Sequence, residues 1–164
     1  MGGRVALSLS ARYPEMVSHL VILDSVGLTL PEVPVVNPLT LAPSEFMSGL
    51  VHHPEKYRKL TPYRTLDDAR ELNHGRQTFA RYLGSQGIVP DPELELSRIT
   101  MPTLLIWGRE DRIIPLAYGK ALAKALPQGE LVVFDDVGHL PHIEAPHLTN
   151  QSIRSFLDRH PPVS

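Results

Sequence analysis

The stretch Thr103-Leu-Leu-Ile-Trp-Gly-Arg-Glu-Asp111 decides how the chain folds. Its first five residues form a short apolar run bounded by polar ones, which predicts a strand with both faces buried. A similar run, Glu130-Leu-Val-Val-Phe134, follows after a segment over residues 116–126 whose apolar residues have helical spacing. Strand, helix and strand in this order predict a βαβ unit, whose two strands are parallel.

The alternation of helices and strands continues on either side of this unit. Residues 3–13 are mostly small and apolar, which predicts a helix buried on most sides, although no N-cap residue precedes it. Residues 19–24 (HLVILD) predict a further strand with both faces buried, and residues 148–157 predict a last helix. We therefore expect an α/β fold with a partial, doubly wound and mostly parallel sheet.

Two of the predicted helices have apolar residues that we expect to face the core. In the helix over residues 116–126 they are Ala117, Ala121, Leu122, Ala125 and Leu126. In the last helix they are Leu148, Ile153, Phe156 and Leu157.

Residues 28–95 differ in character from the rest of the chain. They are interrupted by Pro31, Pro34, Pro38, Pro43, Pro54 and Pro62. The best helix of the segment covers residues 66–83, and one side of it carries Leu66, Ala69, Leu72, Phe79, Ala80 and Leu83. We expect residues 28–95 to form a helical cap, inserted into a core that is built from residues 1–27 and 96–164.

The composition limits what the protein can do. The 164 residues carry a formal net charge of −2 and no cysteine, and 42% of them are hydrophobic. Charges of both signs are interspersed without a basic stripe, so we expect no nucleic-acid partner. No apolar run reaches the ~20 residues of a membrane span, and the residues after Met1 lack the apolar core of a signal peptide. We expect one folded domain in the cytoplasm, without membrane contact.

Polar residues follow each of the three predicted strands, where an open parallel sheet binds its ligands. Asp24 and Ser25 follow the first strand, Asp111 lies in the loop after the second, and His139 lies in the loop after the third. Asp111 could accept the Nδ1 proton of His139 and leave Nε2 to take a proton from a nucleophile. The alternative is structural, because an aspartate in such a loop is usually a turn former or a helix N-cap.

Two motifs carry a resemblance to a known family. Trp107-Gly-Arg-Glu-Asp111-Arg-Ile-Ile-Pro115 resembles the acid loop of the α/β-hydrolases, and Val137-Gly-His139-Leu-Pro-His-Ile-Glu144-Ala-Pro146 resembles their histidine loop. The motifs follow the family order of nucleophile, acid and histidine. The resemblance implies that Asp111 and His139 are two members of a catalytic triad, and that residues 28–95 are the family's variable cap.

The start of the chain resembles the family's nucleophile elbow, G-x-S-x-G. That elbow often ends Ser-Met-Gly-Gly, and this chain opens Met1-Gly2-Gly3-Arg4. The resemblance implies that Met1 stands directly after the nucleophile, where its backbone N–H would serve the oxyanion hole. We expect that the chain starts at an internal methionine or is a gene fragment, and that alone it has no hydrolase activity.

No serine within the chain fits the elbow. Ser25 has Leu23 where the first glycine belongs, and Ser85 follows no predicted strand. Ser8 and Ser10 lie inside the predicted first helix. We therefore assign none of them as the nucleophile.

Two other groups could have a function. Asp24 stands where some relatives carry their acid, but Asp111 has the better motif, so we expect Asp24 to line the pocket floor or to cap a turn. His139 and His142 lie three residues apart with Glu144 nearby, a spacing that also suits a metal site. The family's histidine loop explains these three residues without a metal. We expect no metal ion and no cofactor.

The resemblance implies a hydrolase of carboxylic esters, or of related acyl or carbon–carbon bonds, with a Ser-Asp-His mechanism. The apolar and helical cap favours a small, largely apolar substrate. Two alternatives stay open: a haloalkane dehalogenase or epoxide hydrolase, which uses an aspartate nucleophile, and a non-catalytic interaction module of the same fold. The strand over residues 19–24 would leave an apolar edge open, so we also expect self-association through that edge.

Overall fold

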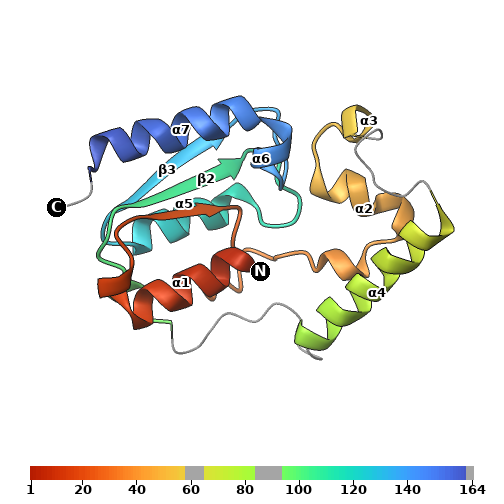
Figure 1. The fold of residues 1–164 in the computed structure, drawn as a ribbon, viewed down its shortest axis with the longest axis horizontal. Helices are drawn as coiled ribbons and strands as arrows, with labels where there is room; N and C mark the ends of the chain where they lie inside the picture. The colour runs from red at the N-terminus through yellow and green to blue at the C-terminus, as the bar shows by residue number, and fades with distance from the viewer. Residues whose placement is uncertain (58–64, 84–93, 162–164) are drawn as a thin grey trace.

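A parallel sheet of three strands forms the centre of the described part of the chain (Figure 1). The computed structural model describes residues 1–57, 65–83 and 94–161. The strands are β1 (Leu20–Leu23), β2 (Thr103–Gly108) and β3 (Gly129–Phe134), in the order β1-β2-β3. Thr103 of β2 lies opposite Leu20 of β1 and Gly129 of β3, and both pairings are parallel. The predicted α/β class is confirmed.

Helices cover both faces of this sheet. α1 (Gly2–Arg12) and α5 (Leu116–Ala125) lie on one face, and α7 (Pro146–Arg159) lies on the other (Figure 1). The short helix α6 (Pro141–Glu144) leads into α7, and 3₁₀ turns cover Pro14–Met16 and Leu96–Arg98. Helices on both faces give the doubly wound arrangement that the sequence predicts.

The central strand β2 supplies side chains to both cores. Leu105 and Trp107 belong to the cluster under α1 and α5, whereas Leu104 and Ile106 pack with Phe156 of α7. Every residue of β2 is buried, because the strand has a neighbour on either side and helices on both faces.

The edge strand β1 is shorter and less buried than predicted. It covers Leu20–Leu23 rather than residues 19–24. Leu20 and Ile22 are buried, but Val21 and Leu23 on the other face are only half-buried. The prediction of two fully buried faces is wrong, because β1 lies at the edge of the described sheet.

The first helix is also less buried than predicted. α1 buries Leu7, Ser10 and Ala11. Val5 is 60% exposed and Leu9 is 47% exposed. The prediction of a helix buried on most sides is wrong, because the described strands cover one side of α1. Its N-terminus has no side-chain cap, as predicted.

Helix α5 buries only part of the face that the sequence predicts. Leu122 and Leu126 are buried as predicted, together with Tyr118 and Gly119. Ala117 and Ala125 are exposed, so their predicted burial is wrong. The reason is the indole of Trp107, because a Cβ added at Gly119 would lie 2.5 Å from that ring. The helix approaches the sheet where it has no side chain.

Helix α7 is longer than predicted and is also rotated. It buries Thr149 and Phe156, and Ile153 is half-buried. Leu148 and Leu157 are exposed, contrary to the prediction. Phe156 is the bulkiest apolar side chain of the helix, and its place against the sheet sets the orientation of the others.

The described part of residues 28–95 consists of helices joined by irregular segments. It contains α2 (Pro43–Leu50), α3 (Pro54–Tyr57), α4 (Leu66–Leu83) and a 3₁₀ turn over Pro38–Thr40. The bounds of α4 are those that the sequence predicts. Its predicted apolar side is partly wrong, since Leu66 is 81% exposed and Ala80 is exposed, while Phe79 is half-buried. The side chains of Ala69, Leu72 and Leu83 lie outside the described residues.

Arg76 of α4 fastens the helix to the earlier part of this segment. Its guanidinium donates to the backbone carbonyls of Leu39 and Leu41, and it lies 5.0 Å from the centre of the Phe46 ring.

None of the helices in the described part of the chain is both long and apolar enough to cross a membrane.

Candidate active site

The three parallel strands end at the same edge of the sheet (Figure 1). The loops after β2 and β3 bring Asp111 and His139 together there. His139 Nδ1 lies 2.9 Å from Asp111 Oδ2. The side chain of Asp111 is fully buried, and that of His139 is 19% exposed. The contact is therefore a hydrogen bond between a buried carboxylate and an imidazole that solvent can reach.

The two carboxylate oxygens of Asp111 have separate partners. Oδ1 accepts the backbone N–H groups of Ile113 at 2.7 Å and Ile114 at 2.9 Å. Oδ2 is the atom that contacts His139. Asp111 therefore caps its own loop and also pairs with His139. The cap orients the carboxylate for the imidazole.

The acid loop and the histidine loop are joined through their backbones. Glu110 N donates to the carbonyl of Val137 at 3.0 Å, and Val137 N donates back to Glu110 Oε2 at 3.1 Å. A Cβ added at Gly108 would lie 2.0 Å from the carbonyl oxygen of Gly138. Only glycine at position 108 allows this approach, which brings Asp111 and His139 into register.

A glutamate that the sequence offered as a metal ligand organises the histidine loop instead. Glu144 Oε1 accepts the backbone N–H groups of Gly138 at 2.9 Å and Leu140 at 3.3 Å. Its Oε2 accepts the backbone N–H of His52 at 2.7 Å. These donors occupy both carboxylate oxygens, and His142 is exposed. The three residues His139, His142 and Glu144 are therefore not arranged around one point.

The segment that ends α2 also contacts the histidine loop. His139 N donates to the carbonyl of Leu50 at 2.8 Å, and the Tyr57 hydroxyl donates to the carbonyl of Glu144 at 3.2 Å. Arg112 of the acid loop donates to the carbonyl of Ser48 at 3.0 Å. Residues 48–57 thus form a strap along the rim of the site, a feature that no motif in the sequence indicates.

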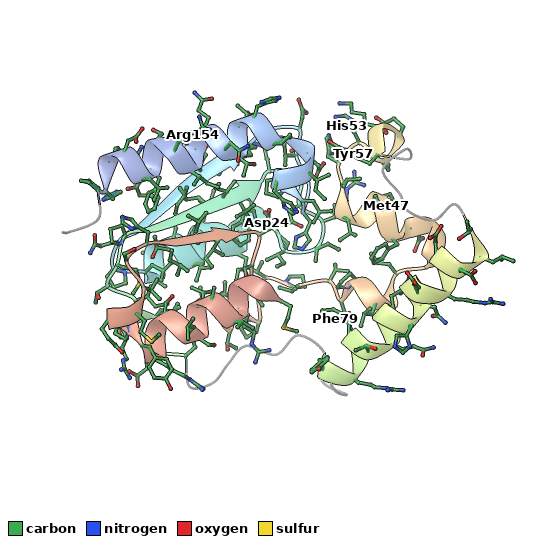
Figure 2. The ribbon with its side chains drawn as sticks, in the orientation of Figure 1. Asp24, Met47, His53, Tyr57, Phe79 and Arg154 are labelled. Atoms are coloured by element: carbon green, nitrogen blue, oxygen red, sulfur yellow. The ribbon has the colours of Figure 1, made fainter. Side chains whose placement is uncertain are left out.

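Asp24 lies beneath the acid loop, at the end of β1 (Figure 2). It is 4% exposed, its Oδ1 accepts the backbone N–H of Gly108 at 3.1 Å, and its Oδ2 is buried. Burial, followed by the negative charge of Asp111, raises the pKa of Asp24 to about 9. The raised pKa favours the neutral form of the Asp24 carboxyl at pH 7.

Arg109 extends from the same loop away from this pair. It forms an exposed ion pair with Asp135, which raises the pKa of the guanidinium through a hydrogen bond and the carboxylate charge. The two arginines of the acid loop thus hold neighbouring groups: Arg109 binds the carboxylate of Asp135 and Arg112 binds the carbonyl of Ser48.

The start of α1 packs against the residues that follow β1. A Cβ added at Gly3 would lie 2.4 Å from Ser25 Oγ. Ser25 is buried and its hydroxyl donates to the carbonyl of Val26, and Ser10 is also buried. Met1 is partly exposed, and burial together with the charge of Arg4 lowers the pKa of its amino group. Ser85 lies outside the described residues.

The described residues thus form an α/β protein, with a parallel sheet, helices on both faces and an aspartate–histidine pair at the carboxyl edge of the sheet. The model of the α/β hydrolase fold family matches residues 51–146. The chain belongs to the α/β hydrolase fold family.

Curated relatives within the family include two kinds of enzyme. The chain is 32% identical over 177 aligned residues to a 2-hydroxy-6-oxononadienedioate/2-hydroxy-6-oxononatrienedioate hydrolase of Pseudomonas sp, covering 97% of this chain and 61% of that protein. It is 28% identical to Lipase 1 of Psychrobacter immobilis, covering 95% of this chain and 53% of that protein. The chain thus spans between 53% and 61% of the length of these relatives.

The solved structures confirm the fold. A meta-cleavage product hydrolase from Pseudomonas fluorescens IP01 superposes with a TM-score of 0.73 at 20% identity, covering 96% of this chain and 61% of that one. A serine hydrolase from the polyaromatic hydrocarbon-degrading bacterium Cycloclasticus zankles superposes with a TM-score of 0.70 at 24% identity, covering 96% of this chain and 61% of that one. At these identities the likeness concerns the fold alone.

Proposed function

We propose that this chain supplies the acid and the histidine of a serine hydrolase that cleaves carboxylic esters or related acyl or carbon–carbon bonds. The single observation that carries the proposal is the 2.9 Å contact between His139 Nδ1 and the buried carboxylate of Asp111. The names of the relatives agree with this range of reactions, since they include a lipase and a hydrolase of a 2-hydroxy-6-oxo acid.

The contact sets the role of each atom in the reaction. Asp111 Oδ2 holds the proton on His139 Nδ1, so that the lone pair of Nε2 faces the reacting groups. Nε2 takes the proton of the serine hydroxyl as its oxygen attacks the substrate carbonyl, and later returns the proton to the leaving group. The buried charge of Asp111 stabilises the imidazolium that exists between these two steps.

In this proposal the serine comes from a segment outside the chain and directly precedes Met1. The backbone N–H of Met1 then serves as one donor of the oxyanion hole. The packing of Gly3 against Ser25 supports this place for α1, because it sets the start of the helix beside the carboxyl edge of the sheet. Because the proposed covalent route needs that serine, we expect the chain alone not to turn over substrate.

Residues 28–95 act as the cap over this site in the same proposal, on a core of residues 1–27 and 96–164. The strap over residues 48–57 contacts both the acid loop and the histidine loop, and these contacts support a cap at the rim of the site. A small substrate whose apolar part lies under the cap fits this arrangement.

The test uses the protein encoded by the complete reading frame that contains this chain. Turnover of p-nitrophenyl butyrate and of a 2-hydroxy-6-oxodienoate is measured for the unchanged protein and for His139→Ala and Asp111→Asn. We expect His139→Ala to abolish turnover and Asp111→Asn to lower kcat by ~10⁴. Exposed His147 provides the control, and His147→Ala should leave kcat unchanged. Retained turnover in His139→Ala would contradict the proposal.

Two alternatives give different results in the same assays. A haloalkane dehalogenase or epoxide hydrolase would have an aspartate at the nucleophile position and would turn over a haloalkane or an epoxide. A non-catalytic interaction module would turn over none of these substrates, although His139 and Asp111 would remain paired.

We also propose that the chain by itself self-associates through β1. β1 pairs only with β2 among the described strands, and its open edge is apolar. Exposed Val5 and Leu9 of α1 add apolar surface beside it. Sedimentation should show dimers or larger species, and a monomer at all concentrations would contradict this.

A further inference from the structure

Two histidines of the strap and an aspartate of the histidine loop meet at one point. His52 and His53 lie between α2 and α3, and Asp136 lies three residues before His139. One ring nitrogen from each histidine and a carboxylate oxygen of Asp136 all lie within 4.8 Å of one another. His52 Nε2 is 3.9 Å from Asp136 Oδ1, and the two imidazole rings are 4.4 Å apart. The sequence singles out a different pair, His139 and His142.

The backbone on both sides of this cluster is held in place. The N–H of His52 donates to Glu144, whose other oxygen holds the N–H of Gly138. Figure 2 shows His53 beside Tyr57, whose hydroxyl donates to the carbonyl of Glu144. The strap and the histidine loop therefore stay at a constant separation without any contribution from the clustered side chains.

The hydrogen bonds of the described residues do not account for the His52 side chain. Among the described residues its buried Nδ1 has no hydrogen-bond partner, and its Nε2 is beyond hydrogen-bond distance of Asp136. Nε2 is therefore the ring atom that a cation between the two side chains would contact. His53 has Glu55 at 3.3 Å from its Nδ1, which is the kind of carboxylate that orients a metal-binding imidazole.

We propose that His52, His53 and Asp136 bind a divalent transition-metal cation such as Zn²⁺, which fastens the strap to the histidine loop. Two imidazole nitrogens and one carboxylate oxygen are a donor set that suits zinc, copper and nickel. Three protein ligands leave the fourth position of a tetrahedral zinc ion to water.

The distances allow the site to form with small movements. Ligand atoms around a tetrahedral zinc ion with bonds of ~2.1 Å lie roughly 3.4 Å apart, so the three atoms must approach one another by on the order of 1 Å. The side chain of Asp136 is 82% exposed and the ring of His53 is partly exposed, so both can turn without repacking the core.

The test measures metal binding to the untagged chain after removal of metal with a chelator. Zinc chloride is titrated into the protein and the heat of binding is recorded. We expect one equivalent to bind, and we expect His53→Gln and Asp136→Asn each to weaken binding at least 10-fold. The matched control is His147→Gln, which removes an exposed histidine of α7 and should leave the affinity unchanged.

A second measurement covers the case in which a variant is misfolded. Zinc should raise the thermal unfolding temperature of the unchanged chain, because it binds the folded state. Circular dichroism checks that His53→Gln and Asp136→Asn are folded, and neither should gain this stabilisation. The proposal fails if the unchanged chain binds no zinc, if both variants bind as tightly as it does, or if His142→Gln abolishes binding.

Discussion

The acid and histidine loops are joined by hydrogen bonds between their backbones, whereas helix α4 is tied to other residues of its own segment. The two loops exchange hydrogen bonds between Glu110 and Val137, and Gly108 brings them within contact of each other. In the other segment, α4 is tied by Arg76 to residues of the same segment. The strap over residues 48–57 carries the contacts to the site rim.

This difference shows where the site depends on precise backbone positions. The pairing of Asp111 with His139 depends on backbone positions that tolerate no added atom at Gly108. The helix α4 has open space around Gly75, and its charged face is exposed. The core can therefore keep one site geometry while the segment above it changes.

The largest expected effect comes from Gly108→Ala. Its Cβ would lie 2.0 Å from the carbonyl oxygen of Gly138, so the two loops must separate, at a cost of about 3 kcal/mol or more in unfolding free energy. Gly75→Ala in α4 is the matched control, because nothing lies within 4 Å of its Cβ and alanine favours a helix by ~1 kcal/mol. Denaturant unfolding measures both. Equal effects would remove the contrast between the two regions.

A smaller effect is expected at the junction of the two regions. Glu144→Ala removes the acceptor of the backbone N–H groups of Gly138, Leu140 and His52, and should destabilise the chain by about 2 kcal/mol. Glu71→Ala changes an exposed glutamate of α4 and should stay within about 0.5 kcal/mol. Hydrogen exchange at the His52 amide should also accelerate in Glu144→Ala. An unchanged exchange rate would show that the strap is held by other contacts.

The third effect is a pH dependence that belongs to the core alone. The folded chain keeps Asp24 protonated up to its pKa of about 9, whereas the unfolded chain ionises it near 3.8. The unfolded state thus binds fewer protons between these values, so Asp24 lowers the free energy of unfolding as pH rises. Asp24→Asn should remove this slope.

The measurement compares unfolding free energies of the unchanged chain and Asp24→Asn from pH 4 to pH 9. The difference should grow in favour of Asp24→Asn with rising pH and level off above pH 9. Parallel curves for the two proteins would mean that the carboxyl of Asp24 is ionised in the folded chain.

Local sequence patterns predict the elements of this fold better than their faces. The bounds of β2 and β3 agree with the predictions to within one residue, because a central parallel strand is apolar along its length. The faces of α5 and α7 differ from the predictions. Gly119 against Trp107 and Phe156 against the sheet decide them, and those contacts join distant parts of the chain.

The candidate site also has a part that the sequence predicts and a part that only the tertiary structure shows. The sequence determined by itself that Asp111 and His139 follow successive strands, since each stands in a recognisable loop after an apolar run. Only the tertiary structure decided that Glu144 holds the strap and that Asp24 is a buried acid. It also decided that His52 and His53 meet Asp136. Each of these contacts joins residues that are far apart in the chain, and local patterns carry no information about such distances.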